Sequence, residues 1–204
     1  FKITKILAIE MSKLFLEVII ANSFDTNALK ILKKKKNLRL IDASNYKVND
    51  GLKHVSVNNE VLIQSEDLKK FNTKDFKIVS KRKPTSKEMK NLIFAFNICR
   101  NVKSNAIVLA SDETTAGIGS GQPSRLDSCK IAINKMKKFI KSNESLVAAS
   151  DAFFPFVDGI EKLVQSGVQA VIQPSGSIRD KDIIKFANET DTVLVFSRTR
   201  HFKH

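Results

Sequence analysis

The stretch VKSNAIVLASDETTAGIGSGQPSR, residues 102–125, decides the fold class. Its apolar run at 106–110 lies between polar residues and is typical of a short buried strand. Three of the chain's seven glycines follow within 117–121, ahead of a helix predicted from about 126 to 141. We interpret the glycine-rich segment as a turn that can present backbone N–H groups to an anion, with a purely structural turn as the alternative. Its spacing matches neither a Walker loop nor the dinucleotide fingerprint.

The alternation of apolar strands and amphipathic helices continues on both sides of this stretch. Short apolar runs predict buried strands, and apolar positions at helical spacing predict the helices between them. This pattern indicates an α/β protein with a layered sheet-and-helix fold. The predicted strands are 18–21, 38–41, 61–64, 76–79, 106–110, 146–149, 170–173 and 193–196, and the predicted helices are 1–17, 25–35, 85–102, 126–141, 158–166 and 179–190.

Individual residues predict where several helices begin or end. Thr85 followed by Glu88 predicts a capping box, in which each side chain accepts a backbone N–H at the start of the helix. Asp25 is the expected N-cap of the second helix, and the lysine run at 33–36 suits that helix's carboxyl end. The more polar segment 45–80 is the expected place for a boundary between two sub-lobes of residues 1–204.

The composition limits the possible functions. The chain has 204 residues, 42% of them hydrophobic, which is enough for a substantial core and excludes intrinsic disorder. Its net charge of +14 suggests a basic nucleic-acid-binding module as one function, yet the last quarter of the chain carries no net charge. The excess is mostly lysine, which is typical of a solvated surface, so we expect no nucleic-acid partner.

The cysteines and apolar runs exclude other classes. Cys99 and Cys129 are isolated in sequence, so neither a disulfide framework nor a metal site is expected. No apolar run is long enough to span a bilayer, and no signal segment is present. We therefore expect a cytoplasmic protein without membrane contact, and because the chain begins at Phe1, an internal or carboxyl-terminal part of a longer one.

Seven segments, in order along the chain, resemble one enzyme family. They are FLEVIIA (15–21), KRKPT (81–85), VKSNAIV (102–108), GIGSGQPSR (117–125), SDAFFPF (150–156), VIQPSGSIRD (171–180) and RHFKH (200–204). Together they resemble the carboxyl-terminal part of the bifunctional AICAR formyltransferase / IMP cyclohydrolase, where AICAR is 5-aminoimidazole-4-carboxamide ribonucleotide. Each motif is only moderately specific, but their common order covers nearly the whole chain.

The resemblance implies a fold, an activity and partners. The fold would be two cytidine-deaminase-like α/β lobes of the transformylase domain. The reaction would transfer a formyl group from 10-formyltetrahydrofolate to AICAR in purine biosynthesis, without a catalytic metal. The family works as a homodimer with active sites at the subunit interface, so the expected partners are AICAR, the folate and a second subunit.

The resemblance also assigns roles to individual residues. Asn105 would donate to the oxyanion near the transferred formyl group, and His204 would help set the protonation state of a catalytic histidine. The expected substrate-binding residues are Phe153 and Arg200 for the ribonucleotide, Asp158 for the pterin, and Arg125 in the active-site region. Structural alternatives are a strand cap for Asn105, a core position for Phe153, a helix N-cap for Asp158 and a frayed terminus for His204.

The principal catalytic pair of the family, a Lys-His, would lie upstream of this chain. Lys53 and His54 repeat the dipeptide, but no proline follows, and we interpret them as part of a variable surface segment. The cyclohydrolase domain would also lie upstream, so the chain alone is expected to be inactive in both reactions. A deaminase of the same general fold is disfavoured because no zinc ligands occur at the required spacing.

Overall fold

The computed structural model describes residues 1–47, 51–67, 69, 71–139 and 145–203. The described residues divide into two compact units, Phe1–Glu66 and Asp67–His204. The division lies inside the polar segment 45–80. No helix among the described residues is both long and apolar enough to cross a membrane.

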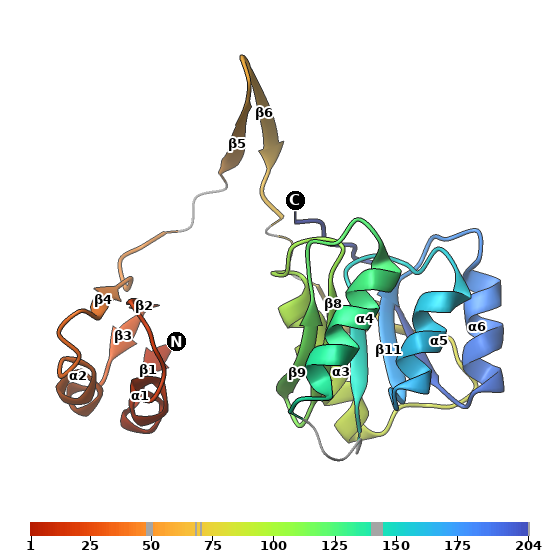
Figure 1. Cartoon of the computed structure of the whole chain (residues 1–204), viewed down its shortest axis with the longest axis horizontal. Coiled ribbons are helices and arrows are strands. Elements are labelled where there is room, and N and C mark those ends of the chain that lie inside the picture. Colours follow the sequence, from red (N-terminus) through yellow and green to blue (C-terminus); the bar gives the residue numbers. More distant parts are fainter. Residues whose placement is uncertain (48–50, 68, 70, 140–144, 204) are drawn as a thin grey trace. The chain divides into compact units, whose positions relative to one another are not determined.

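The described residues of the first unit form two helices, two parallel strand pairs and a hairpin (Figure 1). Its small core joins Ile3, Ala8, Ile19, Ala28 and Leu32, all of them buried. Its elements are β1 (Lys2–Ile3), α1 (Lys5–Ser12), β2 (Val18–Ala21), β3 (Ser23–Phe24), α2 (Thr26–Leu32), β4 (Arg39–Asp42), β5 (Leu52–Val57) and β6 (Glu60–Ser65). β1 pairs with β3, β2 with β4, and β5 with β6.

One prediction for this unit was wrong in detail, and another is confirmed in position only. The helix predicted over 1–17 is only α1, because Lys2–Ile3 pairs with β3 and therefore must be extended. Asp25 does occupy the N-cap position of α2, but its side chain makes no cap hydrogen bond and instead pairs with the ammonium of Lys2 at 2.6 Å. The hairpin strand β5, too polar to stand out in the sequence, was not predicted.

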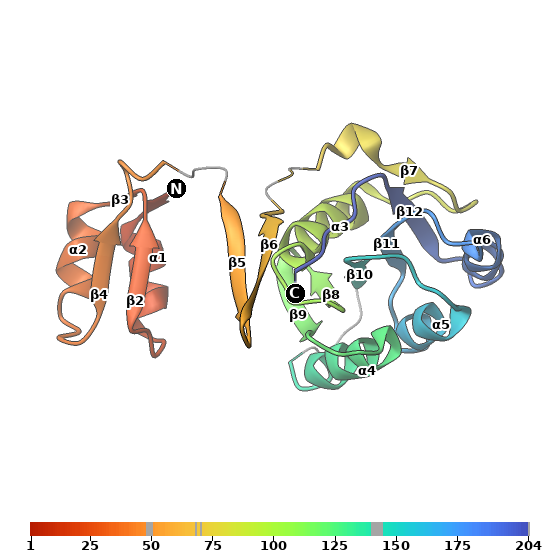
Figure 2. The ribbon, with the colours of Figure 1, turned by 90° about the horizontal axis from the view of Figure 1, so that it is seen from above.

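The second unit is a six-stranded mixed sheet covered by helices on both faces (Figure 2). The strand order is β7-β12-β11-β10-β8-β9, with β10, β11 and β12 parallel and the other neighbouring pairs antiparallel. Its elements are η1 (Thr73–Asp75), β7 (Lys77–Ile78), α3 (Ser86–Cys99), β8 (Ile107–Ser111), β9 (Thr114–Gly119), α4 (Arg125–Met136), β10 (Val147–Ser150), α5 (Val157–Gln165), β11 (Ala170–Pro174), α6 (Asp180–Glu189) and β12 (Val193–Ser197). The predicted α/β class is confirmed.

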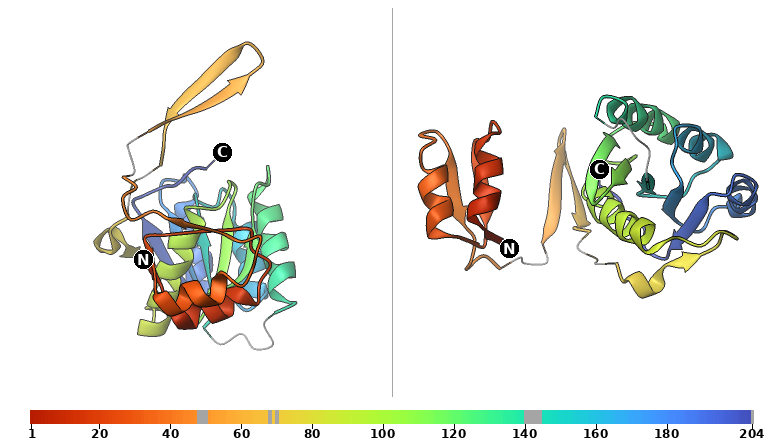
Figure 3. Two further views of the ribbon diagram at one scale, coloured as in Figure 1. Left: turned by 90° about the vertical axis from the view of Figure 1, so that its left-hand side faces the viewer. Right: turned by 90° about the horizontal axis from the view of Figure 1, so that it is seen from below.

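Two apolar layers hold this sheet between its helices. α3 covers one face through Leu92, Ala95 and Phe96. The other face is covered by α4, α5 and α6, as Figure 3 shows in its view from below. The central strands β8, β10, β11 and β12 are buried on both faces, which explains why each of them is a nearly continuous apolar run in the sequence.

The glycine-rich turn was a wrong prediction, because Gly117 and Gly119 lie in strand β9. A Cβ atom on Gly119 would come within 1.9 Å of the Ser128 carbonyl oxygen, and one on Gly117 within 2.1 Å of the Ala132 carbonyl oxygen. These glycines thus let the backbone of α4 pack directly on the sheet edge. The helix itself ends at Met136, and the last residues of the predicted span 126–141 lie outside the described residues.

The predicted capping box at the start of α3 is confirmed. The Thr85 hydroxyl accepts the Glu88 N–H at 3.1 Å, and the Glu88 carboxylate accepts the Thr85 N–H at 2.8 Å. The second carboxylate oxygen of Glu88 pairs with the Arg82 guanidinium at 2.7 Å. Burial alone would raise the pKa of Glu88, but these two partners outweigh burial and hold the pKa below its ordinary value.

Because the pKa of Glu88 is lowered in the folded state, its contribution to stability is present above the ordinary value of 4.5 and is lost as the pH falls through the folded value. Glu88→Gln keeps the cap geometry but removes the charge. We expect this variant to lose about 1 to 2 kcal/mol at neutral pH and much less at pH 3. Urea unfolding across this pH range checks the expectation, and an equal loss at both ends would contradict it.

Candidate functional site

One edge of the second unit's sheet gathers the segments that follow its parallel strands. The loops after β10, β11 and β12 leave from the carboxyl ends of those strands. β8 runs antiparallel to β10, so the segment before β8 lies at the same edge, with Ile107 opposite Ser150. In open α/β sheets this carboxyl edge is where ligands bind.

A pocket of about 490 Å³ lies at this edge. Five of the six predicted site residues line it, although they come from four separate segments of the sequence. The lining residues are Asn105, Pro123, Ser124, Arg125, Leu126, Ala152, Phe153, Phe154, Pro155, Phe156, Asp158, Gly159, Arg200 and Phe202. The sixth predicted residue, His204, lies outside the described residues. Another pocket of the same volume lies along α3 and includes none of the predicted residues.

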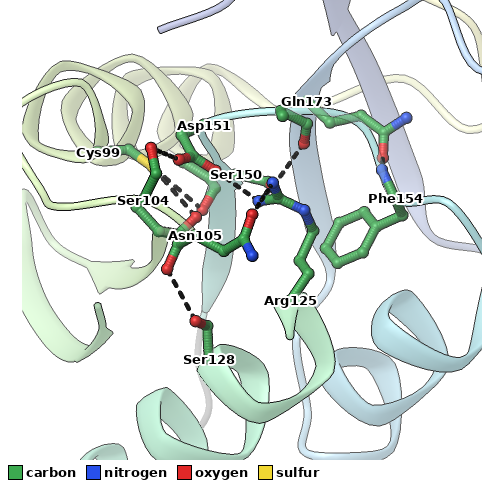
Figure 4. A network of polar contacts seen from close by, with 12 residues as sticks. Cys99, Ser104, Asn105, Arg125, Ser128, Ser150, Asp151, Phe154 and Gln173 are labelled. Atoms are coloured by element: carbon green, nitrogen blue, oxygen red, sulfur yellow. Dashed lines mark hydrogen bonds and ion pairs between the residues drawn. The ribbon is translucent and has the colours of Figure 1, made fainter. Parts of the chain in front are cut away.

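Arg125 is the centre of a buried polar network beneath this pocket (Figure 4). It is the first residue of α4, and only 9% of its surface is exposed. One terminal nitrogen donates to the Ser150 hydroxyl at 2.8 Å and pairs with the Asp151 carboxylate, while the other donates to the Asn105 side-chain oxygen at 2.7 Å. Its guanidinium is therefore fixed by three partners.

The Asn105 amide is held on both sides. Its oxygen faces Arg125, which can only donate, and its nitrogen donates to the carbonyls of Gln122 and Pro123, both at 2.9 Å. The amide orientation is thus unambiguous, and both amide hydrogens are already engaged. An oxyanion in the pocket would have to replace one of these two carbonyl acceptors.

The segment between β10 and α5 supplies the aromatic wall of the pocket. Phe153 and its neighbour Phe154 both line the pocket, but Phe153 is partly exposed, whereas Phe154 is 1% exposed and packs in the core against Gly159. The N-cap of α5 is Phe156, so Asp158 lies in the first helical turn and is not the N-cap. Its carboxylate, exposed at the pocket, accepts the Gly159 N–H at 2.7 Å.

The carboxyl-terminal segment adds a second cation to the pocket. Arg200 lies over the Phe202 ring, 4.2 Å from its centroid, and both residues line the pocket. Between Arg200 and Phe202, His201 is 1% exposed, and its Nδ1–H donates to the Asp67 carboxylate at 2.8 Å. The end of the chain is therefore docked on the second unit as far as it is described.

The cysteines and the Lys-His dipeptide add no second reactive site to the described part of the chain. Burial raises the pKa of Cys129 to about 12 and that of Cys99 well above its ordinary value, so both thiols stay protonated near neutral pH. Among the described residues, no cluster of three or more His, Cys, Asp and Glu side chains could hold a metal ion. Lys53 and His54 lie on β5, where His54 is exposed.

The amino-acid sequence was also compared with known protein families. A model of the AICARFT/IMPCHase bienzyme matches residues 1–135, which is about two thirds of the chain. The chain belongs to the AICARFT/IMPCHase bienzyme family. The resemblance of the seven motifs is therefore confirmed at the level of the family.

Individual members of the AICARFT/IMPCHase family agree with this assignment. The bifunctional purine biosynthesis protein PurH of Persephonella marina is 43% identical over 196 residues, which cover 95% of this chain and 38% of that protein. PurH of Lactobacillus acidophilus is 45% identical over 197 residues, covering 96% of this chain and 38% of that protein. PurH of Buchnera aphidicola is 46% identical over 196 residues, covering 95% and 37%. The chain thus spans less than two fifths of the length of these relatives.

Several residues that support the pocket of this AICARFT/IMPCHase chain were not predicted from the sequence. Asp151 and Ser104 lie inside motifs that were recognised, but neither was singled out. Their importance comes from contacts with distant segments, which no local pattern reveals. His201 had a signal in the sequence, since two histidines, an arginine and a phenylalanine within the last five residues are unusual for a tail, but the prediction fell on His204 instead.

Proposed function

We propose that the pocket at the carboxyl edge of the second unit is part of the site that transfers a formyl group from 10-formyltetrahydrofolate to AICAR. The observation that carries this proposal is the convergence of Arg125, Arg200, Phe153 and Asn105 on one pocket. These residues are separated in sequence, and each belongs to a different motif of the family resemblance. Family membership supports a role in purine biosynthesis.

The chemistry of the pocket suits a ribonucleotide. AICAR carries a flat heterocycle, a ribose and a phosphate. Phe153 offers an aromatic face to the ring, and Arg200 offers a planar guanidinium that can bind phosphate oxygens with two parallel hydrogen bonds. Arg125 retains N–H groups beyond the three bonds that hold it, which suits the carboxamide oxygen of the nucleotide.

The formyl donor would use the other side of the pocket. The exposed Asp158 carboxylate can accept N–H groups of a pterin, and the half-exposed Phe156 ring provides apolar surface beside it. The reaction needs an amine placed against the formyl carbon, loss of a proton, and stabilisation of the tetrahedral oxyanion. The Asn105 amide could donate a hydrogen bond to the oxyanion if it gave up its hydrogen bond to the carbonyl of Gln122 or Pro123.

Other features of the proposal rest on the resemblance. The catalytic Lys-His pair would precede this chain in the sequence, and His204 would lie close to that pair in space. The antiparallel pair β8–β9 beside the three parallel strands β10, β11 and β12, with helices on both faces, is compatible with a cytidine-deaminase-like lobe. We include in the proposal a homodimer that shares its active sites, a cytoplasmic location and a reaction that needs no metal.

The two activities of the family provide the test. In the full-length protein, Asn105→Ala is expected to lower kcat for formyl transfer about 100-fold and to leave IMP cyclohydrolase activity on formylated AICAR unchanged. Each reaction is followed separately by absorbance.

Asn101→Ala is the matched control, because Asn101 is exposed just after α3 and its amide donates to the Asn97 carbonyl of that helix, away from the pocket. It should retain both activities. Wild-type formyl transfer by Asn105→Ala, or a loss confined to the cyclohydrolase, would refute the assignment of this pocket to the formyl transfer.

A further inference from the structure

Asp151 is a buried carboxylate directly beneath the pocket. It follows the last residue of β10, is 1% exposed and does not itself line the pocket. No role was assigned to it by the motifs. A charge buried this deeply is costly unless it is paired and hydrogen-bonded, so its partners reveal what it holds in place.

The two carboxylate oxygens of Asp151 have different partners. One pairs with the guanidinium of Arg125, which lines the pocket. The other accepts the hydroxyl proton of Ser104 at 2.6 Å. The carboxylate therefore contacts the pocket residue Arg125 directly, and it also contacts Ser104, which immediately precedes the pocket residue Asn105 (Figure 4).

Ser104 extends the network to the end of the chain. Its hydroxyl oxygen accepts the Lys203 N–H at 3.2 Å, and its own N–H donates to the Lys203 carbonyl at 2.9 Å. The backbone carbonyl of Asp151 accepts the His201 N–H at 3.3 Å. Ser104 and Asp151 together therefore fasten the segment that carries Arg200.

We propose that Asp151 is a positioning residue that holds both cationic side chains of the pocket in place. Its negative charge orients Arg125, and its hydrogen bond with Ser104 helps to hold the terminal segment that carries Arg200. This inference rests on the proposed function. Without the carboxylate, the Arg125 guanidinium would keep only neutral partners in a buried position and would turn toward water or ligand. The Ser104 hydroxyl would no longer be held in a fixed orientation, and its hydrogen bond with the Lys203 N–H in the terminal segment would weaken.

The test compares Asp151→Asn, Ser104→Ala and Glu88→Gln in the full-length protein. Glu88 is the matched control, because it is 2% exposed and pairs with an arginine at 2.7 Å, and its polar partners Arg82 and Thr85 do not line this pocket. The KM for AICAR, the KM for the folate, kcat and the unfolding temperature are measured for each variant, together with cyclohydrolase activity.

Asp151→Asn is expected to raise the KM for AICAR about ten- to a hundredfold, with a smaller change in the KM for the folate. Ser104→Ala is expected to raise the KM for AICAR a fewfold through the terminal segment alone. Asp151→Glu, which restores the charge, should recover part of the loss. Glu88→Gln should lower the unfolding temperature without changing either KM.

An unchanged KM for AICAR in Asp151→Asn, with a lowered unfolding temperature as in Glu88→Gln, would overturn the positioning role while leaving the proposed function intact. If Asp151→Asn does not fold, an unchanged KM in Ser104→Ala would overturn the positioning role in the same way. Absence of formyl transfer in the wild-type protein would instead overturn the proposed function, and the positioning role with it.

Discussion

Arg125→Ala in the full-length protein is expected to lower kcat/KM for formyl transfer to AICAR by about 100-fold or more. Arg125 is the pocket residue with the most fixed geometry, bound to Ser150, Asp151 and Asn105 at once. Its removal takes away a ligand donor, releases the Asn105 amide and leaves Asp151 buried without a counter-ion. An unpaired buried charge costs about 3 to 5 kcal/mol, so the unfolding temperature should fall as well.

Arg125→Lys separates these effects, and both variants are measured by steady-state kinetics with AICAR varied and by thermal unfolding. Lysine keeps the charge next to Asp151, so stability should recover in part. A single ammonium cannot replace the two terminal nitrogens of a planar guanidinium, so activity should stay low. Full activity in Arg125→Lys would show that charge alone matters, and full activity in Arg125→Ala would contradict the role of this pocket.

Gly119→Ala is expected to destabilise the second unit by about 3 kcal/mol or more. The new Cβ would meet the backbone of Ser128 in α4, which cannot move aside as a flexible side chain would. α4 would be pushed off β9, and Arg125 at its first position would shift with it. Thermal unfolding and the soluble yield of the variant measure the effect.

Gly176→Ala is the control for this substitution. Gly176 has a positive φ of +116°, which Gly119 does not have, and nothing lies within 4 Å of a Cβ built there. Only the conformational cost of about 1 to 2 kcal/mol is expected. A loss in Gly119→Ala no larger than that in Gly176→Ala would mean that the close approach of α4 costs no more than backbone strain, and would contradict the expected effect at 119.

Much of the fold could be predicted because the second unit's central strands are buried on both faces. The apolar runs at 106–110, 146–149, 170–173 and 193–196 follow directly from that burial. β9 was not predicted because it contains glycines, which strands usually lack. These glycines are needed because the backbone of α4 lies directly against β9. Glycine at that position looks like a turn in the sequence, and only the packed helix shows why it is needed.

The candidate site was predictable in its members but not in their connections. Phe153 and Phe154 are adjacent and chemically identical and both line the pocket, yet Phe153 is partly exposed there and Phe154 is a core residue. Successive side chains of an extended segment point to opposite sides, so the sequence does not show which of the two phenylalanines is buried. Only the family resemblance favoured Phe153 as the substrate-binding residue. Asp151 was missed because its partners Ser104 and Arg125 reach it only through the sheet topology.

A crystal structure of the full-length protein with AICAR bound tests the central claim most directly. The account predicts the nucleotide in the pocket at the carboxyl edge of β10, with its ring on Phe153 and its polar groups on Arg125 and Arg200. AICAR bound elsewhere, with this pocket empty and these three side chains without ligand contact, would contradict the account.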